Sequence, residues 1–196
     1  MTRRLADGQR SDGFATSKEQ SARLDAELIT RCRAGDLGAF EEIYRLHSGR
    51  LYNVVARMVG ANEADDLVQD TFLQAYRKLG GFRGDSTLAT WLYRLAVNLC
   101  LDRLRSGEAK VSRKAESFEE DEPAPAPRRT TELVVTRLDL ERGLEALPPS
   151  YRAAFVLHDV EGFEHREVAA ILGIAEGSSK SLVHKARLRL RTLLTR

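Results

Sequence analysis

The feature of this chain that most constrains its fold is the spacing of the apolar residues, which is helical wherever a pattern is visible. One stripe follows positions i, i+4, i+7 and i+11, and its members are Leu88, Leu92, Leu95 and Leu99. An earlier stripe consists of Phe40, Ile43, Tyr44, Leu51, Val54, Val55 and Met58. No segment alternates between apolar and polar residues as a half-buried strand would. The pattern predicts an all-α fold.

A proline-rich, acidic stretch divides the helical pattern into two parts. It reads E-E-D-E-P-A-P-A-P-R-R and contains three of the five prolines in the chain. Alternating prolines oppose helix formation and favour extended backbone, which is typical of a linker. We therefore expect two small helical domains, residues 25–106 and 132–196, joined by a flexible linker over residues 107–131. Residues 1–24 are polar and rich in Gly and Ser, and we expect a disordered extension there.

Capping residues and glycines indicate where the helices begin and end. In the first domain we expect helices over residues 26–33, 37–59, 63–79 and 87–105, with N-caps supplied in turn by Asp25, Asp36, Asn62 and either Asp85 or Ser86. In the second domain we expect helices over residues 132–147 and 151–160, followed by a pair of helices over residues 164–194.

Residues 164–194 have the pattern of a helix-turn-helix. Gly173 supplies a left-handed turn that a side chain would resist, and Ala169 is small where the two helices cross closely. The outward face of the second helix carries groups that can reach phosphates and base edges in a major groove, namely Ser178, Lys180, Ser181, His184, Lys185 and Arg187. A basic, solvated terminal helix is the alternative interpretation, but the glycine, the small residue and the cations agree on DNA binding.

A second candidate surface mixes aromatic side chains with cations in the segment T-W-L-Y-R-L-A-V-N, residues 90–98. Aromatic faces and Arg planes can stack with bases that have left the duplex. The surface includes the preceding glycine-rich loop, and its members are Phe82, Arg83, Trp91, Arg94 and Asn98. Trp91 as an ordinary packing residue is the alternative. A chain with both surfaces can bind a duplex and handle a strand opened nearby.

The helix expected over residues 63–79 has an acidic, polar face. Asp66, Gln69 and Asp70 stand at i, i+3 and i+4, beside the apolar Leu67 and Phe72. The helix dipole favours carboxylates near a helix N-terminus, so a solvated face is one interpretation. A docking site for a basic protein partner is the other, and spacing alone does not decide between them.

Composition and cysteine spacing exclude several classes of function. The 31 basic and 29 acidic residues leave a net charge of +2, but cations gather in residues 176–196 and acids in residues 116–122. Cys32 and Cys100 have no metal-ligand spacing, so we expect buried, reduced thiols, no metal and a cytoplasmic protein. No signal core or membrane-spanning stretch is visible. Without a phosphate-cradling loop or a nucleophile–base pair, we expect neither an enzyme nor a bound cofactor.

Three segments of the chain carry a family resemblance. They are D-D-L-V-Q-D-T-F-L-Q-A-Y-R-K-L, F-R-G-D-S-T-L-A-T-W-L-Y-R-L-A-V-N and L-P-P-S-Y-R-A-A-F-V-L-H-D-V-E-G-F-E-H-R-E-V-A-A-I-L-G-I. Together they resemble the extracytoplasmic-function (ECF) sigma factors of the bacterial sigma-70 family, over about residues 25–194. The resemblance implies a non-catalytic RNA polymerase subunit that selects promoters and assists their melting, as in a stress response.

The resemblance also assigns a role to each candidate surface. The acidic helix would dock on the coiled coil of the RNA polymerase β′ subunit through Asp66, Gln69, Asp70, Phe72 and Tyr76. The surface from Phe82 to Asn98 would bind the −10 element with a flipped base, and residues 178–187 would read the −35 element. The linker would run toward the polymerase active centre. The implied partners are the bacterial RNA polymerase core with its β′ and β subunits, promoter DNA and an anti-sigma factor, without membrane insertion.

Several positions depart from the family pattern. Ser179 stands where an apolar residue is usual, Leu182 where Arg is frequent, and residues 165–166, His and Arg, replace a common aromatic–acidic pair. Lys180 and Lys185 occupy positions often filled by Arg, and Lys lacks the planar fork that binds guanine through two hydrogen bonds. These departures bear on which −35 sequence is read.

Two other functions remain open from the residues alone. A stand-alone helix-turn-helix regulator would use the first domain for sensing or dimerising, although a sensor has no need of a base-stacking loop. An enzyme acting on nucleic acid would need a metal-carboxylate pattern, and Asp65–Asp66 has no matching His. Tight promoter binding in the absence of RNA polymerase core would favour the stand-alone regulator over a sigma factor.

Overall fold

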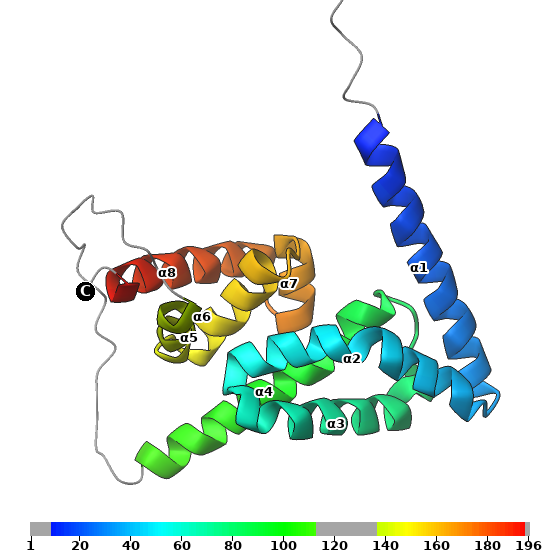
Figure 1. The fold of residues 1–196 in the computed structure, drawn as a ribbon, viewed down its shortest axis with the longest axis horizontal. Helices are drawn as coiled ribbons and strands as arrows, with labels where there is room; N and C mark the ends of the chain where they lie inside the picture. Colours follow the sequence, from blue (N-terminus) through cyan, green and yellow to red (C-terminus); the bar gives the residue numbers. More distant parts are fainter. Residues whose placement is uncertain (1–8, 113–136, 195–196) are drawn as a thin grey trace, which may run out of the picture.

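The computed structural model describes residues 9–112 and 137–194, which form helices and short connections (Figure 1). The first stretch contains α1 (Gln9–Arg33), α2 (Leu37–Val59), α3 (Ala61–Lys78), the 3-10 turn η1 (Leu79–Gly81) and α4 (Leu88–Ser112). The second contains α5 (Arg137–Glu145), α6 (Pro149–Phe155), the π-helical turn η2 (Val156–Val160), α7 (His165–Leu172) and α8 (Glu176–Leu194). Neither stretch contains a strand, and the predicted all-α fold is confirmed for these residues.

The helices α2, α3 and α4 form a first unit around a shared apolar core, against which the end of α1 packs (Figure 1). The leucine stripe predicted on α4 faces this core, since Leu88 and Leu92 are almost completely buried. Asp36 caps α2 as predicted, and its carboxylate accepts a hydrogen bond from the Ala39 amide at 3.2 Å. The helical stripes in the sequence therefore account for most of this unit.

The helices α5 to α8 form a second unit. Pro149 occupies the first turn of α6, where its missing N–H is not needed. Gly143 lets α5 approach α8 closely, because a Cβ at this position would lie 3.0 Å from Cδ2 of Leu190. The helix predicted over residues 151–160 is confirmed only in part, since its second half widens into the π-helical turn η2.

The two units pack against each other, with α7 beside α4 (Figure 1). The rings of Tyr93 and Phe163 meet edge to face with their centroids 4.9 Å apart. The buried side chain of Arg152 crosses between the units and donates a hydrogen bond to the carbonyl of Met58. Most of the predicted linker lies outside the described residues, so its flexibility and its path stay predictions.

Two predicted segment boundaries are wrong. The helix α1 begins at Gln9, so the prediction of disorder does not hold for residues 9–24, while residues 1–8 lie outside the described chain. Asp25 is therefore not an N-cap, and its buried carboxylate lies 3.4 Å from Nε2 of His47. At the other end of the unit, α4 continues to Ser112 and includes the first residues of the predicted linker.

Two predicted N-caps are also replaced by neighbouring residues. The helix α3 begins at Ala61, directly after Gly60, whose φ of 92° turns the chain between α2 and α3, so Asn62 lies inside the helix. The helix α4 is capped by Thr87 instead of Asp85 or Ser86, because the Thr87 hydroxyl accepts a hydrogen bond from the Thr90 amide at 3.1 Å. Both corrections are shifts of one or two residues.

Further features of the described residues bear on the classes of function. None of the described helices is long and apolar enough to cross a membrane. No three His, Cys, Asp or Glu side chains gather as metal ligands within residues 9–112 and 137–194. Cys100 is buried, and burial raises the pKa of its thiol to about 12, which keeps it protonated near neutral pH. Cys32 is half-buried, and burial raises its pKa as well.

Candidate nucleic-acid and protein interfaces

The predicted helix-turn-helix consists of α7, a glycine turn and α8. Glu164 and Glu167 form a capping box at the start of α7, in which the Glu167 carboxylate accepts a hydrogen bond from the Glu164 amide at 3.0 Å. Gly173 ends α7 in the left-handed conformation with a φ of 68°, as its position in the sequence predicts. The amide of Ile174 then donates to the carbonyl of Ala169 at 3.1 Å and closes the turn.

Five of the predicted DNA-reading residues lie on the exposed side of α8. They are Ser178, Lys180, Ser181, His184 and Lys185. Val183, Ala186 and Leu190 lie on the opposite side and are buried in the core. Lys180 is paired with Glu176 one turn earlier, with 2.7 Å between Nζ and Oε1. Because both side chains are half exposed, this pair is weak and can open when a phosphate competes for the ammonium group.

Arg187 differs from the other predicted DNA-reading residues, because its guanidinium is already bound. Nε and Nη2 donate to the two carboxylate oxygens of Asp159, at 2.8 Å and 2.5 Å. The carboxylate raises the pKa of Arg187 through this hydrogen bond and its charge. Asp159 was not predicted, because it stands outside α8 in the sequence and no local pattern marks it.

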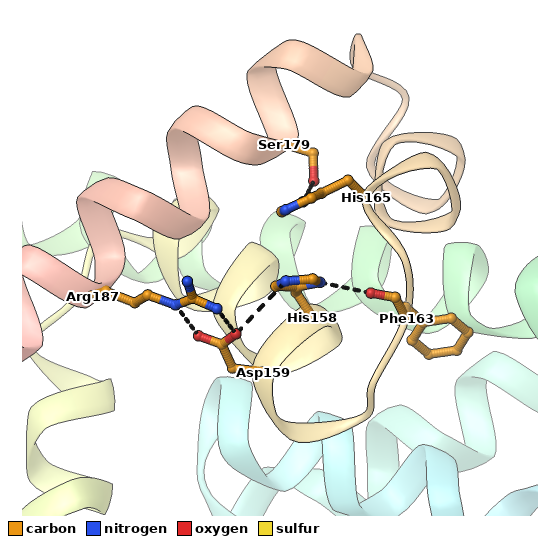
Figure 2. Close-up of polar contacts among 6 residues, drawn as sticks. All are labelled: His158, Asp159, Phe163, His165, Ser179 and Arg187. Atoms are coloured by element: carbon orange, nitrogen blue, oxygen red, sulfur yellow. Dashed lines mark hydrogen bonds and ion pairs between the residues drawn. The ribbon is translucent and has the colours of Figure 1, made fainter. Parts of the chain in front are cut away.

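The structure brings together two of the positions that depart from the family pattern. Nδ1 of His165 lies 3.1 Å from Oγ of Ser179, which is fully buried (Figure 2). The ring of His165 also stacks on that of His158, with centroids 4.0 Å apart and ring planes 22° apart. Burial, followed by the charges of His158 and Lys180, lowers the pKa of His165. In the sequence, the one signal for this contact was that Ser179 is polar at a position where an apolar residue is usual.

The aromatic surface is formed by the loop after η1 and the first turns of α4. The rings of Phe82 and Trp91 pack with centroids 5.2 Å apart, and both side chains are half-buried. Arg33 of α1 donates to the carbonyl of Phe82 and ties this loop to the first helix. Arg83 and Asn98 are exposed. Trp91 therefore combines packing with a partly open face, and its contact with a base stays a prediction.

Arg94, another predicted member of this surface, is engaged by the second unit. Nε and Nη2 of Arg94 donate to the carbonyl of Ala170 in α7, at 3.1 Å and 2.8 Å. The neighbouring Tyr93 is buried against Phe163, and burial raises the pKa of its phenol to about 12. In this arrangement the helix-turn-helix therefore covers one part of the aromatic surface.

The acidic face predicted on α3 is exposed, with Asp66, Gln69 and Asp70 all facing solvent. Phe72 does not belong to this exposed face, because it is only 4% exposed and its ring packs against Phe40 and Tyr44. In this arrangement Phe72 supports the helix from below, and its direct contact with a partner stays a prediction.

Two large apolar side chains extend the acidic face along α3. Leu73 is 54% exposed and stands one turn beyond Asp70, and Tyr76 is 53% exposed and stands a further turn along. Tyr76 was predicted as a contact residue and Leu73 was not, although Leu73 stands three residues after Asp70 on the same side of the helix. Apolar side chains left in water beside carboxylates are typical of a protein-binding surface.

Comparisons with known proteins agree on one family for both units. Residues 43–110 match the family described as Sigma-70 region 2, and residues 137–190 match Sigma-70, region 4. The ECF RNA polymerase sigma factor SigM of Mycobacterium tuberculosis is 39% identical over 184 residues, which cover 93% of this chain and 89% of that protein. The ECF RNA polymerase sigma-E factor of Escherichia coli is 33% identical over 172 residues, covering 83% of this chain and 90% of that protein.

Solved structures show the same fold. The sigma factor RpoE, solved in complex with the anti-sigma factor NepR from Bartonella quintana, has a TM-score of 0.62 and 30% identity, covering 80% of this chain and 96% of that chain. CnrH, solved in complex with the cytosolic domain of CnrY, has a TM-score of 0.64 and 24% identity, covering 88% of this chain and 97% of that chain.

Proposed function

The chain belongs to the ECF sigma factors of the sigma-70 family, and from that premise we propose how its surfaces divide the work of promoter recognition. It is an RNA polymerase sigma factor, which directs core polymerase to promoters, recognises −35 and −10 elements and assists melting. The observation that supports this division is that one chain presents a helix with exposed cations and hydroxyls, a loop with two half-buried packed rings, and an acidic–apolar face.

We propose that α3 binds the core polymerase. Asp66, Gln69 and Asp70 would meet cations on the β′ subunit, while Leu73 and Tyr76 would be buried in the contact. Burying exposed apolar side chains supplies most of the affinity in such an interface, and charges fix which partner fits. Phe72 would hold the helix in place from the core side.

We propose that the loop and helix around Phe82 and Trp91 bind the opened −10 strand. A protein that opens a duplex without ATP must recover the stacking energy by binding the exposed bases. The paired rings offer an apolar wall, and the exposed Asn98 amide offers a donor and an acceptor for a base edge. Arg83 and, once α7 moves away, Arg94 would bind phosphates.

We propose that α8 reads the −35 element in the major groove through Ser178, Lys180, Ser181, His184 and Lys185. Lys binds phosphate as a point charge, and it lacks the fork that Arg uses on guanine. The set therefore favours phosphate contacts from the lysines and base contacts from Ser181 and His184. Arg187 is not part of this set, because Asp159 already binds it.

The same premise extends to partners and place of action. We propose that the chain has no catalytic activity of its own and works in the cytoplasm, where its polymerase and promoters are. An anti-sigma factor is a further proposed partner, supported by the RpoE relative that was solved with one. Such a partner would bind while the polymerase-binding face of α3 is free.

Footprinting tests the proposed division of surfaces. A selected promoter is footprinted with the chain alone, with core polymerase alone and with both. We expect protection at −35 and −10 only when both are present. The Lys185→Ala variant should weaken binding and reduce the salt slope by about one unit if Lys185 contacts phosphate. Equal protection by the chain alone would favour the stand-alone regulator.

A further inference from the structure

Two kinds of contact hold the recognition helix α8 in its unit. One is apolar packing of Val183, Ala186 and Leu190 in the core. The hydrophobic effect has no direction, so burial of these side chains does not by itself set the rotation of the helix to the precision that base reading needs. A helix that reads base edges needs its side chains placed to within about 0.5 Å. Directed polar contacts must supply the remaining precision.

The first directed contact is the fork between Arg187 and Asp159 (Figure 2). Two parallel hydrogen bonds fix both the distance and the orientation of the partners, which a single ion pair does not. The Asp159 side chain is 18% exposed and that of Arg187 is 55% exposed. The carboxylate is thus the more rigidly placed partner, and it holds α8 against η2.

The second directed contact is made by the buried hydroxyl of Ser179, which lies 3.1 Å from Nδ1 of His165. Ser179 precedes Arg187 by about two helical turns, roughly 12 Å along the axis. The exposed side chains of Lys180, Ser181 and His184 lie on the stretch of α8 between these two points. The DNA-reading part of the helix is therefore held at both ends.

His158 lies between the two contacts (Figure 2). Its Nδ1 lies 2.7 Å from the carbonyl of Phe163, and because a carbonyl only accepts, Nδ1 carries the proton. Its ring stacks on His165, and its Nε2 lies 3.9 Å from the carboxylate of Asp159. The loop before α7 thus holds His158 in place, and His158 packs between the two attachment points of α8.

We propose that Asp159 and His165 are positioning residues for −35 recognition, which hold α8 where its exposed side chains match the groove. Arg187 is the point on α8 that Asp159 grips, and it does not read bases. The inference rests on the proposed −35 role of α8. Asp159 also neutralises a cation that would otherwise attract any phosphate. It therefore favours sequence-dependent binding over sequence-independent binding.

The test uses holoenzyme reconstituted from core polymerase and the full chain. Two duplex promoters carry the same −10 element, and one has an intact −35 element selected by the wild-type holoenzyme while the other has a scrambled one. The measured quantity is the ratio of the two dissociation constants, which reports discrimination at −35. Asp159→Asn, Asp159→Glu and Arg187→Lys are compared with wild type, and thermal unfolding of each chain is recorded.

Asp159→Asn should lower the discrimination ratio by about tenfold, the effect of losing one good base contact. It should also raise affinity for the scrambled duplex, with a salt slope steeper by about 0.9 if the freed Arg187 binds one phosphate. Arg187→Lys keeps the charge pair but lacks the fork, so it should lose discrimination while keeping its melting temperature. Asp159→Glu should keep most of the discrimination ratio that Asp159→Asn loses, because Glu also has two carboxylate oxygens that can accept from the guanidinium.

Glu145→Gln is the matched control, since it removes one exposed carboxylate from the same unit away from the fork, and it should leave the ratio unchanged. An unchanged ratio in Asp159→Asn would overturn the inference. The inference would also be overturned if Asp159→Asn weakened binding to the intact and the scrambled promoter equally and lowered the melting temperature, because that result shows a structural role only. If wild type itself fails to discriminate, the −35 role of α8 is wrong and this inference falls with it.

Discussion

Ser179 is a polar residue without exposed surface, and the imidazole of His165 gives its hydroxyl a partner at 3.1 Å. A buried hydroxyl without a partner costs about 1–3 kcal/mol, so the two residues compensate for each other. Each departs from the family pattern at its own position, and the contact joins the start of α7 to α8. A sequence shows each departure separately, and only the fold shows that they belong together.

We expect the second unit to lose stability as the pH falls through about 6.5. The folded protein lowers the pKa of His165 below its ordinary value of 6.5, mainly by burial and then by His158, Lys180 and Arg187, while Glu176 opposes the shift. The unfolded chain therefore binds more protons in acid, and stability is fully present above the unfolded pKa and decreases below it. Thermal unfolding of the full chain near pH 8 and near pH 5.5 measures the effect.

A double variant isolates this histidine from the carboxylates that also titrate in acid. His165→Phe with Ser179→Val removes the imidazole and the hydroxyl together, so no buried polar group is left without its partner. Its melting temperature should decrease less than that of wild type between the two pH values. An equal decrease in both chains would assign the acid sensitivity to other groups.

Phe82 and Asn98 are expected to matter for strand opening more than for duplex binding. Phe82→Ala or Asn98→Ala removes a stacking wall or a base-edge contact, worth about 1–3 kcal/mol per base. Permanganate reactivity of thymines near the start site should decrease in both variants. A template already mismatched in its −10 region should restore most of the activity. Normal reactivity in both variants would show that these side chains serve only the loop and helix.

At the scale of elements, α3 is expected to carry the attachment to polymerase. Asp66→Lys with Asp70→Lys places two cations on the exposed face without touching the core beneath it. Like charges facing each other across an interface cost several kcal/mol, so association with core polymerase should weaken by well over about tenfold. Pull-down with core polymerase measures this, and circular dichroism confirms that the helix is kept.

Asp102→Lys is the matched control for this charge reversal. Asp102 is an exposed carboxylate on α4, and within the described residues it pairs only with its helical neighbour Arg105. It should associate with core polymerase as wild type does. Unchanged association of the α3 double variant would instead make its acidic face a solvated helix start, as its spacing alone allows.

The elements themselves were predictable where one residue type decides the local backbone. Asp36 caps α2 and Gly173 turns the chain between α7 and α8, as their positions in the sequence indicate. The start of α4 was missed by one or two residues because Asp85, Ser86 and Thr87 can all cap a helix, and the sequence does not rank them. The first part of α1, residues 9–25, was missed because its composition resembles that of a disordered segment.

The site was predictable where its residues stand on one helix face, and not where they come from separate elements. Helical spacing gives the exposed sides of α3 and α8. The fork between Asp159 and Arg187 and the contact of Arg94 with Ala170 join residues from different helices, so no local pattern reveals them. The contact role of Phe72 came from the family resemblance and not from helical spacing, and in the structure its side chain is buried in the core.

At the scale of the whole molecule, the two units must separate before one promoter can be held by both. The −35 and −10 elements are named by their positions relative to the transcription start, so they lie about 25 base pairs apart. At 3.4 Å per base pair this is roughly 85 Å along the DNA. In the structure α7 lies against α4, and Ala170 accepts two hydrogen bonds from Arg94. If α8 binds the −35 element and Arg94 the −10 strand, as proposed, this contact has to break.

A distance measurement tests this opening. Spin labels are attached to two introduced cysteines, Arg45→Cys in α2 and Glu145→Cys in α5, both at exposed positions. Cys32 is replaced by Ser so that it is not labelled. The distance between the labels reports the separation of the two units. We expect a short distance in the free chain and a longer one in the holoenzyme bound to a promoter. An unchanged distance on promoter binding would contradict the account of how the units are used.

The central claim is that this chain gives RNA polymerase core its choice of promoter. Run-off transcription from a randomised promoter library, with core polymerase and the chain together, tests this most directly. We predict discrete transcripts whose templates share one −35 and one −10 sequence at a fixed spacing, and none with either component alone. Transcripts without a shared upstream sequence, or the same transcripts from core polymerase alone, would contradict the claim.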